Sequence, residues 1–217
     1  MIISEKIKIL KEQLPKHVTL VAVSKTKPVS SLMEAYDAGQ RIFGENKIQE
    51  MTEKWAEMPK DIAWHMIGHV QTNKVKYMAP FVNLVHAVDR LKLLKEINKQ
   101  AKANDRVIDC LLQIKIAEED SKFGMSEVDA NALLASEAYK NMTHIRVVGL
   151  MGMATFTDNT KQIASEFDTL KRYYDGIAGI HNLTTLSMGM SGDYELAIAH
   201  GSNMIRVGSA IFGERNY

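Results

Sequence analysis

The 217-residue sequence predicts a parallel α/β protein, and the expected architecture is a (β/α)8 barrel of the TIM type. Short apolar segments alternate with amphipathic segments along the whole chain, and eight strand-like segments can be counted. Strict alternation predicts parallel strands joined by right-handed crossovers. The rival architecture is a doubly wound open sheet, because a count of eight strands from sequence is easily seven. No linker rich in Gly, Pro or Ser divides the chain, so we expect one domain over residues 1–217.

Each element follows from the spacing of its apolar residues and from the turn residues at its ends. An opening helix is predicted because one helical face carries Ile3, Ile7, Leu10 and Leu14. The expected strands cover 20–24, 41–44, 62–68, 82–88, 107–116 (the longest), 144–153, 184–189 and 203–208. The expected helices cover about 30–39, 47–57, 73–80, 90–103, 128–139, 161–174 and 193–201, before a helix-like tail.

Charge and composition exclude several classes of protein. The formal net charge is +1, from 27 basic and 26 acidic residues, and no run of five like charges appears, which argues against nucleic-acid binding. Charges interrupt the first 14 residues, and no apolar segment approaches the roughly 18 residues of a membrane span. A single cysteine, Cys110, excludes an internal disulfide and fits a reducing compartment. We therefore expect a cytoplasmic protein that binds neither nucleic acid nor membrane.

The stretch LVAVSKTKP places two lysines where the first expected strand ends. Side chains alternate along a strand, so Val21, Val23 and Lys25 share one side. Branched residues dominate a barrel interior, which predicts that Lys25 points inward above two valines. Lys27 has the same parity, but Pro28 follows it and the strand is expected to have ended.

An inward lysine above an apolar layer has chemical consequences. Desolvation lowers the pKa of such an amine, and the neutral amine can attack a carbonyl to form a Schiff base. The alternative is that Lys25 extends outward to solvent or pairs with Glu45. The first strand alone leaves both interpretations open.

Two glycine-rich stretches near the end of the chain predict a phosphate site. The first, SMGMSGD, contains Gly189, Ser191 and Gly192, and the second, RVGSAIFG, contains Gly208 and Ser209. Free backbone N–H groups in such loops bind anions, and barrels often hold a phosphate between the loops after strands 7 and 8. An ordinary helix N-cap is the alternative use of Ser191.

The sequence resembles the YggS/PROSC family of pyridoxal-phosphate-binding proteins through nearly its whole length. The resemblance is carried, in order, by AVSKTKP, FGEN, WHMIG, EDSKFG, SMGMS and IRVGSAIFG. It implies a barrel of the alanine racemase N-terminal domain kind without the second β domain, and pyridoxal 5'-phosphate held through a lysine aldimine. It also implies a role in intracellular vitamin B6 homeostasis, with no established catalytic activity.

The resemblance also implies roles for individual residues. It puts the aldimine on Lys25, Arg206 against the pyridine nitrogen and Asn46 beside the ring. The phosphate positions it implies are Ser191, Gly208 and Ser209. Since arginine does not give up its proton, the ring nitrogen facing it stays unprotonated and the ring is a weaker electron sink.

Several residues keep open roles. Lys47 stands where an aromatic residue is frequent in the family, and Lys115 stands where asparagine is usual, so contacts at the rim are in doubt. His65 could lie near the pocket or be a satisfied core residue. Lys27 and Lys122 carry charges whose part in cofactor release the sequence does not assign.

A racemase needs a base on each face of its substrate, and related racemases take the second base from another domain and subunit. The chain reaches Tyr217 directly after the last expected strand, and no motif marks a second base. We therefore expect a non-catalytic, monomeric pyridoxal phosphate carrier, with apoenzymes that require the cofactor as candidate partners. The alternatives are a weak pyridoxal-phosphate-dependent amino-acid racemase or lyase, and a cofactor-free Schiff-base aldolase.

Overall fold

Eight parallel strands form a closed barrel in which every strand pairs with the next and β8 pairs with β1. The computed structural model describes residues 2–119 and 123–214. Closure confirms the expected barrel and excludes the open sheet. The strands are β1 (Thr19–Val23), β2 (Ile42–Glu45), β3 (Ala63–Met66), β4 (Val82–Val88), β5 (Ile108–Gln113), β6 (Ile145–Met151), β7 (Thr185–Met190) and β8 (Met204–Val207).

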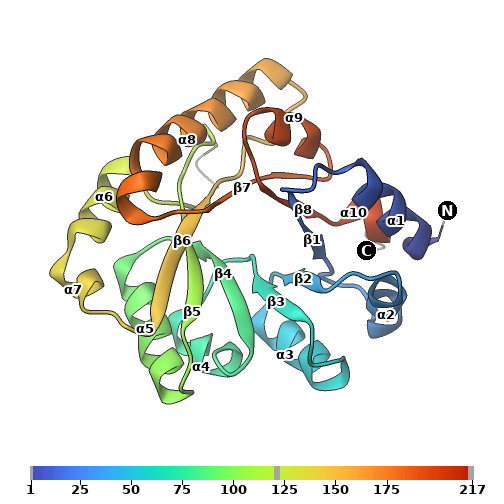
Figure 1. Cartoon of the computed structure of the whole chain (residues 1–217), viewed down its shortest axis with the longest axis horizontal. Coiled ribbons are helices and arrows are strands. Elements are labelled where there is room, and N and C mark those ends of the chain that lie inside the picture. Colours follow the sequence, from blue (N-terminus) through green and yellow to red (C-terminus); the bar gives the residue numbers. More distant parts are fainter. Residues whose placement is uncertain (1, 120–122, 215–217) are drawn as a thin grey trace.

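Helices surround the strands on the outside of the barrel (Figure 1). The first described helix, α1, packs beside the last one, α10, on one side of the barrel. The helices are α1 (Ile3–Gln13), α2 (Val29–Asp37), α3 (Ile48–Glu57), α4 (Val75–Met78, after the 3-10 helix η1, Thr72–Lys74), α5 (Leu91–Ala103), α6 (Glu127–Ala135), α7 (Glu137–Lys140), α8 (Thr160–His181), α9 (Tyr194–Ala199) and α10 (Ser209–Phe212). None of these described helices is both long enough and apolar enough to cross a bilayer.

Three of the differences from the expected boundaries have a clear structural cause or extent. Strand β5 is not the longest, because the chain leaves the sheet after Gln113 and Ile114 forms a bridge with Met125. The expected helix over 128–139 is two helices, because the Ser136 side chain accepts from the backbone N–H of Tyr139 and starts a new helix. Helix α8 continues beyond residue 174 to His181.

Two apolar clusters, one on each side of the sheet, account for the packing. The barrel interior holds a small inner cluster of Val21, Leu84, Ala87, Leu111, Met151 and Met204. The larger outer cluster lies between strands and helices and includes Leu20 and Ala22. The alternation expected for β1 is therefore confirmed, with Val21 facing inward and its neighbours outward. The same alternation of side chains continues beyond the end of β1, toward the mouth of the barrel.

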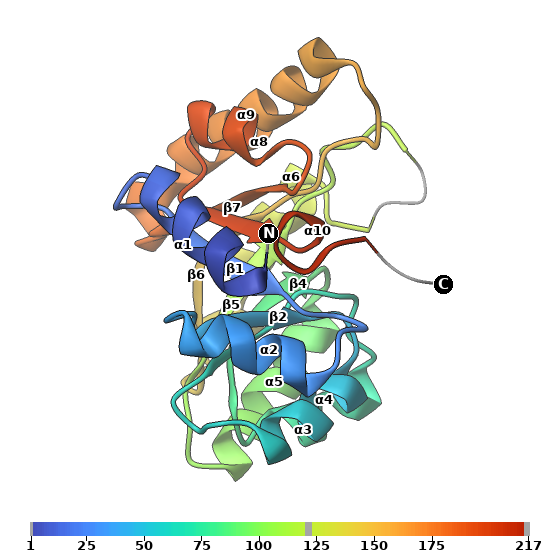
Figure 2. The same ribbon diagram turned by 90° about the vertical axis from the view of Figure 1, so that its right-hand side faces the viewer.

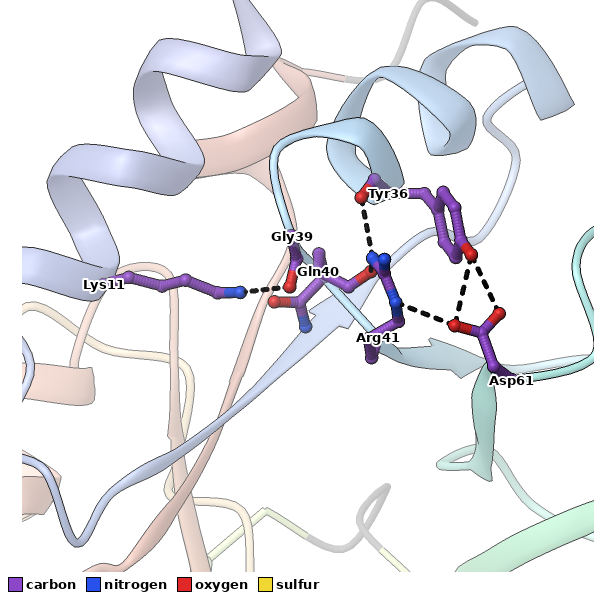
Figure 3. Close-up of polar contacts among 6 residues, drawn as sticks. All are labelled: Lys11, Tyr36, Gly39, Gln40, Arg41 and Asp61. Carbon is purple, nitrogen blue, oxygen red and sulfur yellow. Dashed lines mark hydrogen bonds and ion pairs between the residues drawn. The ribbon is translucent and has the colours of Figure 1, made fainter.

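A group of polar side chains holds the elements together at the start of β2 (Figure 3). The Arg41 guanidinium donates to Asp61 at 2.9 Å and to the carbonyl of Tyr36 at 2.7 Å. The Tyr36 hydroxyl donates to Asp61 at 2.9 Å, and this hydrogen bond raises the pKa of Tyr36. Lys11 of α1 donates to the carbonyl of Gly39 at 2.7 Å. Because the Arg41–Asp61 pair is solvent-exposed, its contribution to stability is only about 0–1 kcal/mol.

The outer cluster predicts a contrast between two phenylalanines. Phe167 on α8 is fully buried, whereas Phe156 in the preceding loop is 92% exposed. Phe167→Ala should lower the free energy of unfolding by about 3–5 kcal/mol, since it removes a ring from a packed core. Phe156→Ala should change it by less than about 0.5 kcal/mol. Denaturant unfolding measures both, and equal losses would show that the outer cluster does not dominate stability.

Candidate functional site

A cavity of about 620 Å³ opens at the carboxyl ends of the strands. The loop before α6, the loop before α8 and helix α10 lie on this side of the barrel (Figure 2). All six residues singled out from the sequence as cofactor-binding line this one cavity: Lys25, Asn46, Ser191, Arg206, Gly208 and Ser209. Barrel closure thus brings together residues that are more than 180 positions apart in the chain.

Lys25 reaches the cavity because strand alternation persists beyond the end of β1. Val23 and Lys25 both line the cavity, whereas Ser24 between them is fully buried on the other side. The Ser24 hydroxyl donates to Glu45 there, at 2.6 Å. The ammonium partner of Glu45 is Lys54, at 2.7 Å. Lys27 also lines the cavity, and its amine donates to the carbonyl of Glu214 at 2.9 Å.

Arg206 is a buried cation in the floor of the cavity, with 4% of its surface exposed. Its guanidinium donates to the carbonyl and hydroxyl of Ser187, at 3.0 and 2.5 Å, and to the carbonyl of Gly152 at 3.0 Å. These bonds use three of its five N–H donors. Desolvation lowers the pKa of Arg206 to about 10 against the opposing effect of Asp193, so the group stays charged at neutral pH.

Two neutral histidines lie behind Arg206 in the barrel interior. The Ser187 hydroxyl lies 3.4 Å from Nδ1 of His86, and Nε2 of His86 lies 3.0 Å from Nδ1 of His65. Since a guanidinium only donates, the Ser187 proton points toward His86, which then donates from Nε2 to His65. Burial lowers the pKa of His65 to about 3 and that of His86 well below 6.5. His65 is therefore a hydrogen-bonded core residue and does not line the cavity.

The loop after β7 is joined to the turn after β8 through one hydroxyl. The Ser191 oxygen accepts from the backbone N–H groups of Gly208, at 3.0 Å, and Ala210, at 3.5 Å. A Cβ added to Gly208 would lie 3.2 Å from the Val23 side chain, so glycine lets the two segments approach closely. Gly192 has open space around it. These two backbone N–H groups point at a hydroxyl oxygen, and the same arrangement could bind the oxygen of an anion.

His69, which the sequence places after the third strand, also lines the cavity. Other residues of the wall were not identified from the sequence, namely Gln113, Phe123, Phe156 and Asp158. The imidazole of His69 stacks on Phe123 with ring centres 4.6 Å apart. All but Gln113 lie in loops, where strand alternation gives no signal. Gln113 ends β5, and its amide donates to the Phe123 carbonyl at 2.8 Å. It was missed because the strand was expected to continue to residue 116.

The remaining lysines lie outside this wall or outside the described residues. Lys47 is exposed at the start of α3, and Lys115 is exposed just after β5. Neither belongs to the described lining of the cavity. Lys122 is outside the residues that the structure describes. Within residues 2–119 and 123–214, no group of three His, Cys, Asp or Glu side chains is arranged to hold a metal ion.

The fold and the site together define a class: a (β/α)8 barrel whose mouth presents a lysine, a buried guanidinium and two loops joined by the Ser191 hydroxyl. The chain belongs to the family described as alanine racemase, N-terminal domain, whose model matches residues 2–216. Two curated relatives are each called pyridoxal phosphate homeostasis protein. The Aquifex aeolicus protein is 36% identical, covering 91% of this chain and 87% of its own length. The Escherichia coli protein is 38% identical, with coverage of 94% and 88%.

Solved structures agree with this family assignment. PipY of Synechococcus elongatus, determined with PLP bound, superposes with a TM-score of 0.89 at 34% identity, covering 97% of this chain and all of PipY. Alanine racemase from Streptomyces lavendulae has a TM-score of 0.77 at 16% identity, and the match spans 57% of that chain, so it shows the fold alone. The resemblance read from the motifs is confirmed.

The buried histidine pair predicts a loss of stability in acid. Above about pH 6.5 both histidines are neutral whether the chain is folded or not; below it, only the unfolded chain takes up protons there. The free energy of unfolding should therefore fall by roughly 1.4 kcal/mol per pH unit for each histidine as the pH drops toward the folded pKa. Denaturant titrations at about pH 7 and pH 5 give the free energy of unfolding at each pH. Between these two pH values, His65→Gln should lose about 2 kcal/mol less of that free energy than the wild type. Identical losses would contradict the assignment of a neutral, buried His65.

Proposed function

We propose that this chain binds pyridoxal 5'-phosphate in the barrel mouth and serves in the homeostasis of that cofactor. The observation that carries the proposal is the convergence of Lys25, the Arg206 guanidinium and the Ser191–Gly208 cradle on one cavity. The relatives called pyridoxal phosphate homeostasis protein, and the PLP-bound PipY structure, support the same role.

The chemistry of the donors fits this cofactor. Pyridoxal phosphate supplies an aldehyde, which condenses with an amine with loss of water, and a phosphate anion. Lys25 provides the amine, and backbone N–H groups with the hydroxyls of Ser191 and Ser209 provide neutral donors for an anion. Arg206 and Lys27 add positive charge to the same wall.

Each residue then has a separate task. Lys25 holds the cofactor covalently, while Ser191, Gly208 and Ser209 bind its phosphate. Arg206 has N–H groups left that would donate to the ring nitrogen, and its hydrogen bonds to Ser187 and Gly152 would hold it in place. A guanidinium keeps its proton, so it can only donate. Asn46 lines the same cavity and would lie beside the ring.

We propose that the protein holds and releases the cofactor without turning over a substrate. A ring nitrogen that faces an arginine stays unprotonated, which weakens the ring as an electron sink. The chain then works as a monomeric single domain in the cytoplasm, and apoenzymes that need the cofactor are its recipients. Addition of D- or L-amino acids should accordingly yield no racemised or cleaved product.

The two lysines of the mouth can be separated by substitution. Lys25→Ala should abolish the visible absorbance of lysine-bound cofactor, although the Arg206 and phosphate contacts retain some non-covalent binding. Lys27→Ala should keep that absorbance, because its amine lies beyond the end of β1 and contacts the Glu214 carbonyl. Its expected effect is on the release rate, through the loss of a positive charge near the mouth. Absorption spectra measure both, and an unchanged Lys25→Ala spectrum would refute the proposed role of Lys25.

The phosphate cradle predicts a loss of affinity on removal of one hydroxyl. Ser191→Ala deletes a contact to a charged acceptor worth roughly 1.5–3 kcal/mol. The dissociation constant of pyridoxal phosphate should therefore rise by about ten- to a hundred-fold in equilibrium titrations. Ser165→Ala, on the exposed face of α8, is the matched control and should leave it unchanged. An unaltered constant for Ser191→Ala would mean that the phosphate binds elsewhere.

A further inference from the structure

A buried ion-pair cluster lies directly behind the loop that carries Lys25. Glu45 at the end of β2 is fully buried, and Lys54 on α3 is 5% exposed. The Lys54 ammonium donates to Glu45 and Glu50, each at 2.7 Å, and to the carbonyl of Ser24 at 2.8 Å. Its three N–H donors are thus all used. One oxygen of Glu45 accepts both Lys54 and Ser24, while its other oxygen, Oε2, has no partner among the described residues.

The cluster holds the backbone on both sides of Lys25. The carbonyl of Ser24, just before Lys25, accepts from Lys54. The N–H of Thr26, just after Lys25, donates to Glu50 at 2.6 Å. Thr26 has a φ of +63°, a left-handed conformation that a β-branched residue rarely adopts. Such a conformation persists only where the surrounding contacts impose it, and the Glu50 carboxylate contributes such a contact.

We propose that Glu50, with Lys54 and Glu45 behind it, is a positioning residue that fixes the Lys25 backbone so that the amine meets the incoming aldehyde. This inference rests on the proposed function. Glu50 does not line the cavity, so it acts only through the Ser24–Thr26 loop. Burial raises the pKa of Glu45, and the nearby Lys54 ammonium opposes that rise.

The test distinguishes an effect on the position of Lys25 from a general loss of binding at the site. Glu50 is the residue to change, because its side chain is 22% exposed and its loss leaves the Lys54–Glu45 pair intact. Glu50→Ala removes the acceptor for Thr26, whereas Glu50→Gln keeps a neutral acceptor there. Asp61→Ala removes the exposed ion pair at the opposite end of β2 (Figure 3) and is the matched control.

Two measurements are made on each protein after removal of bound cofactor. The first is the rate at which the absorbance of lysine-bound cofactor appears on mixing with pyridoxal phosphate. The second is the equilibrium affinity for pyridoxine 5'-phosphate, which has the same ring and phosphate but no aldehyde. Glu50→Ala should slow the covalent step by about tenfold or more, the equivalent of one charged hydrogen bond, and leave the pyridoxine phosphate affinity unchanged. The rate of the covalent step in Glu50→Gln should lie between the rates in Glu50→Ala and the wild type. The rate in Asp61→Ala should equal that of the wild type.

Two results would overturn the inference. One is a covalent step in Glu50→Ala as fast as in the wild type, and the other is an equal fall in pyridoxine phosphate affinity, which would indicate a general loss of the site. Both leave the proposed function standing, since the wild type still forms the absorbing species. A wild type that forms no such species contradicts the proposed function itself.

Discussion

Closure of the barrel is the constraint on which the site depends. Once β8 pairs with β1, every strand has one face toward an interior too small for anything but side chains, and the alternation along each strand becomes fixed. Val21 then fills the interior, and Lys25, four residues later on the same face, reaches the cavity at the mouth. The same closure brings Arg206 on β8 into the wall that contains Lys25.

The charges at the mouth are supported in two different ways. Arg206 is held from behind by neutral groups, Ser187 and Gly152, and no carboxylate in the described part of the chain forms an ion pair with it. The Lys25 loop is held by an ion-pair cluster on the outer face, where Glu50 and Lys54 bond to the peptide groups around it. The contacts of Arg206 therefore leave its positive charge available to a ligand, whereas the charges of the ion-pair cluster lie away from the cavity.

The sequence predicts the fold and many residues of the cavity wall, but it does not predict the contacts that hold those residues in place. Strand parity predicted that Lys25 points inward, and the glycine-rich turns predicted Ser191 and Gly208, because each depends on local spacing. The roles of Lys25, Asn46 and Arg206 came from the resemblance to a family. The end of β5 at Gln113 could not be predicted, since the apolar run continues while the chain turns to pair with Met125. The Glu50 contact was equally inaccessible, because it joins a helix to a loop 24 residues earlier and leaves no local pattern.

The most direct test of the account is chemical fixation of the cofactor, followed by peptide mapping. The protein is loaded with pyridoxal phosphate, reduced with borohydride and digested, and the modified peptide is sequenced by mass spectrometry. The account predicts a single stoichiometric adduct on Lys25. An adduct on Lys27, Lys47 or Lys122 in place of Lys25 would contradict both the strand parity argument and the role drawn from the family.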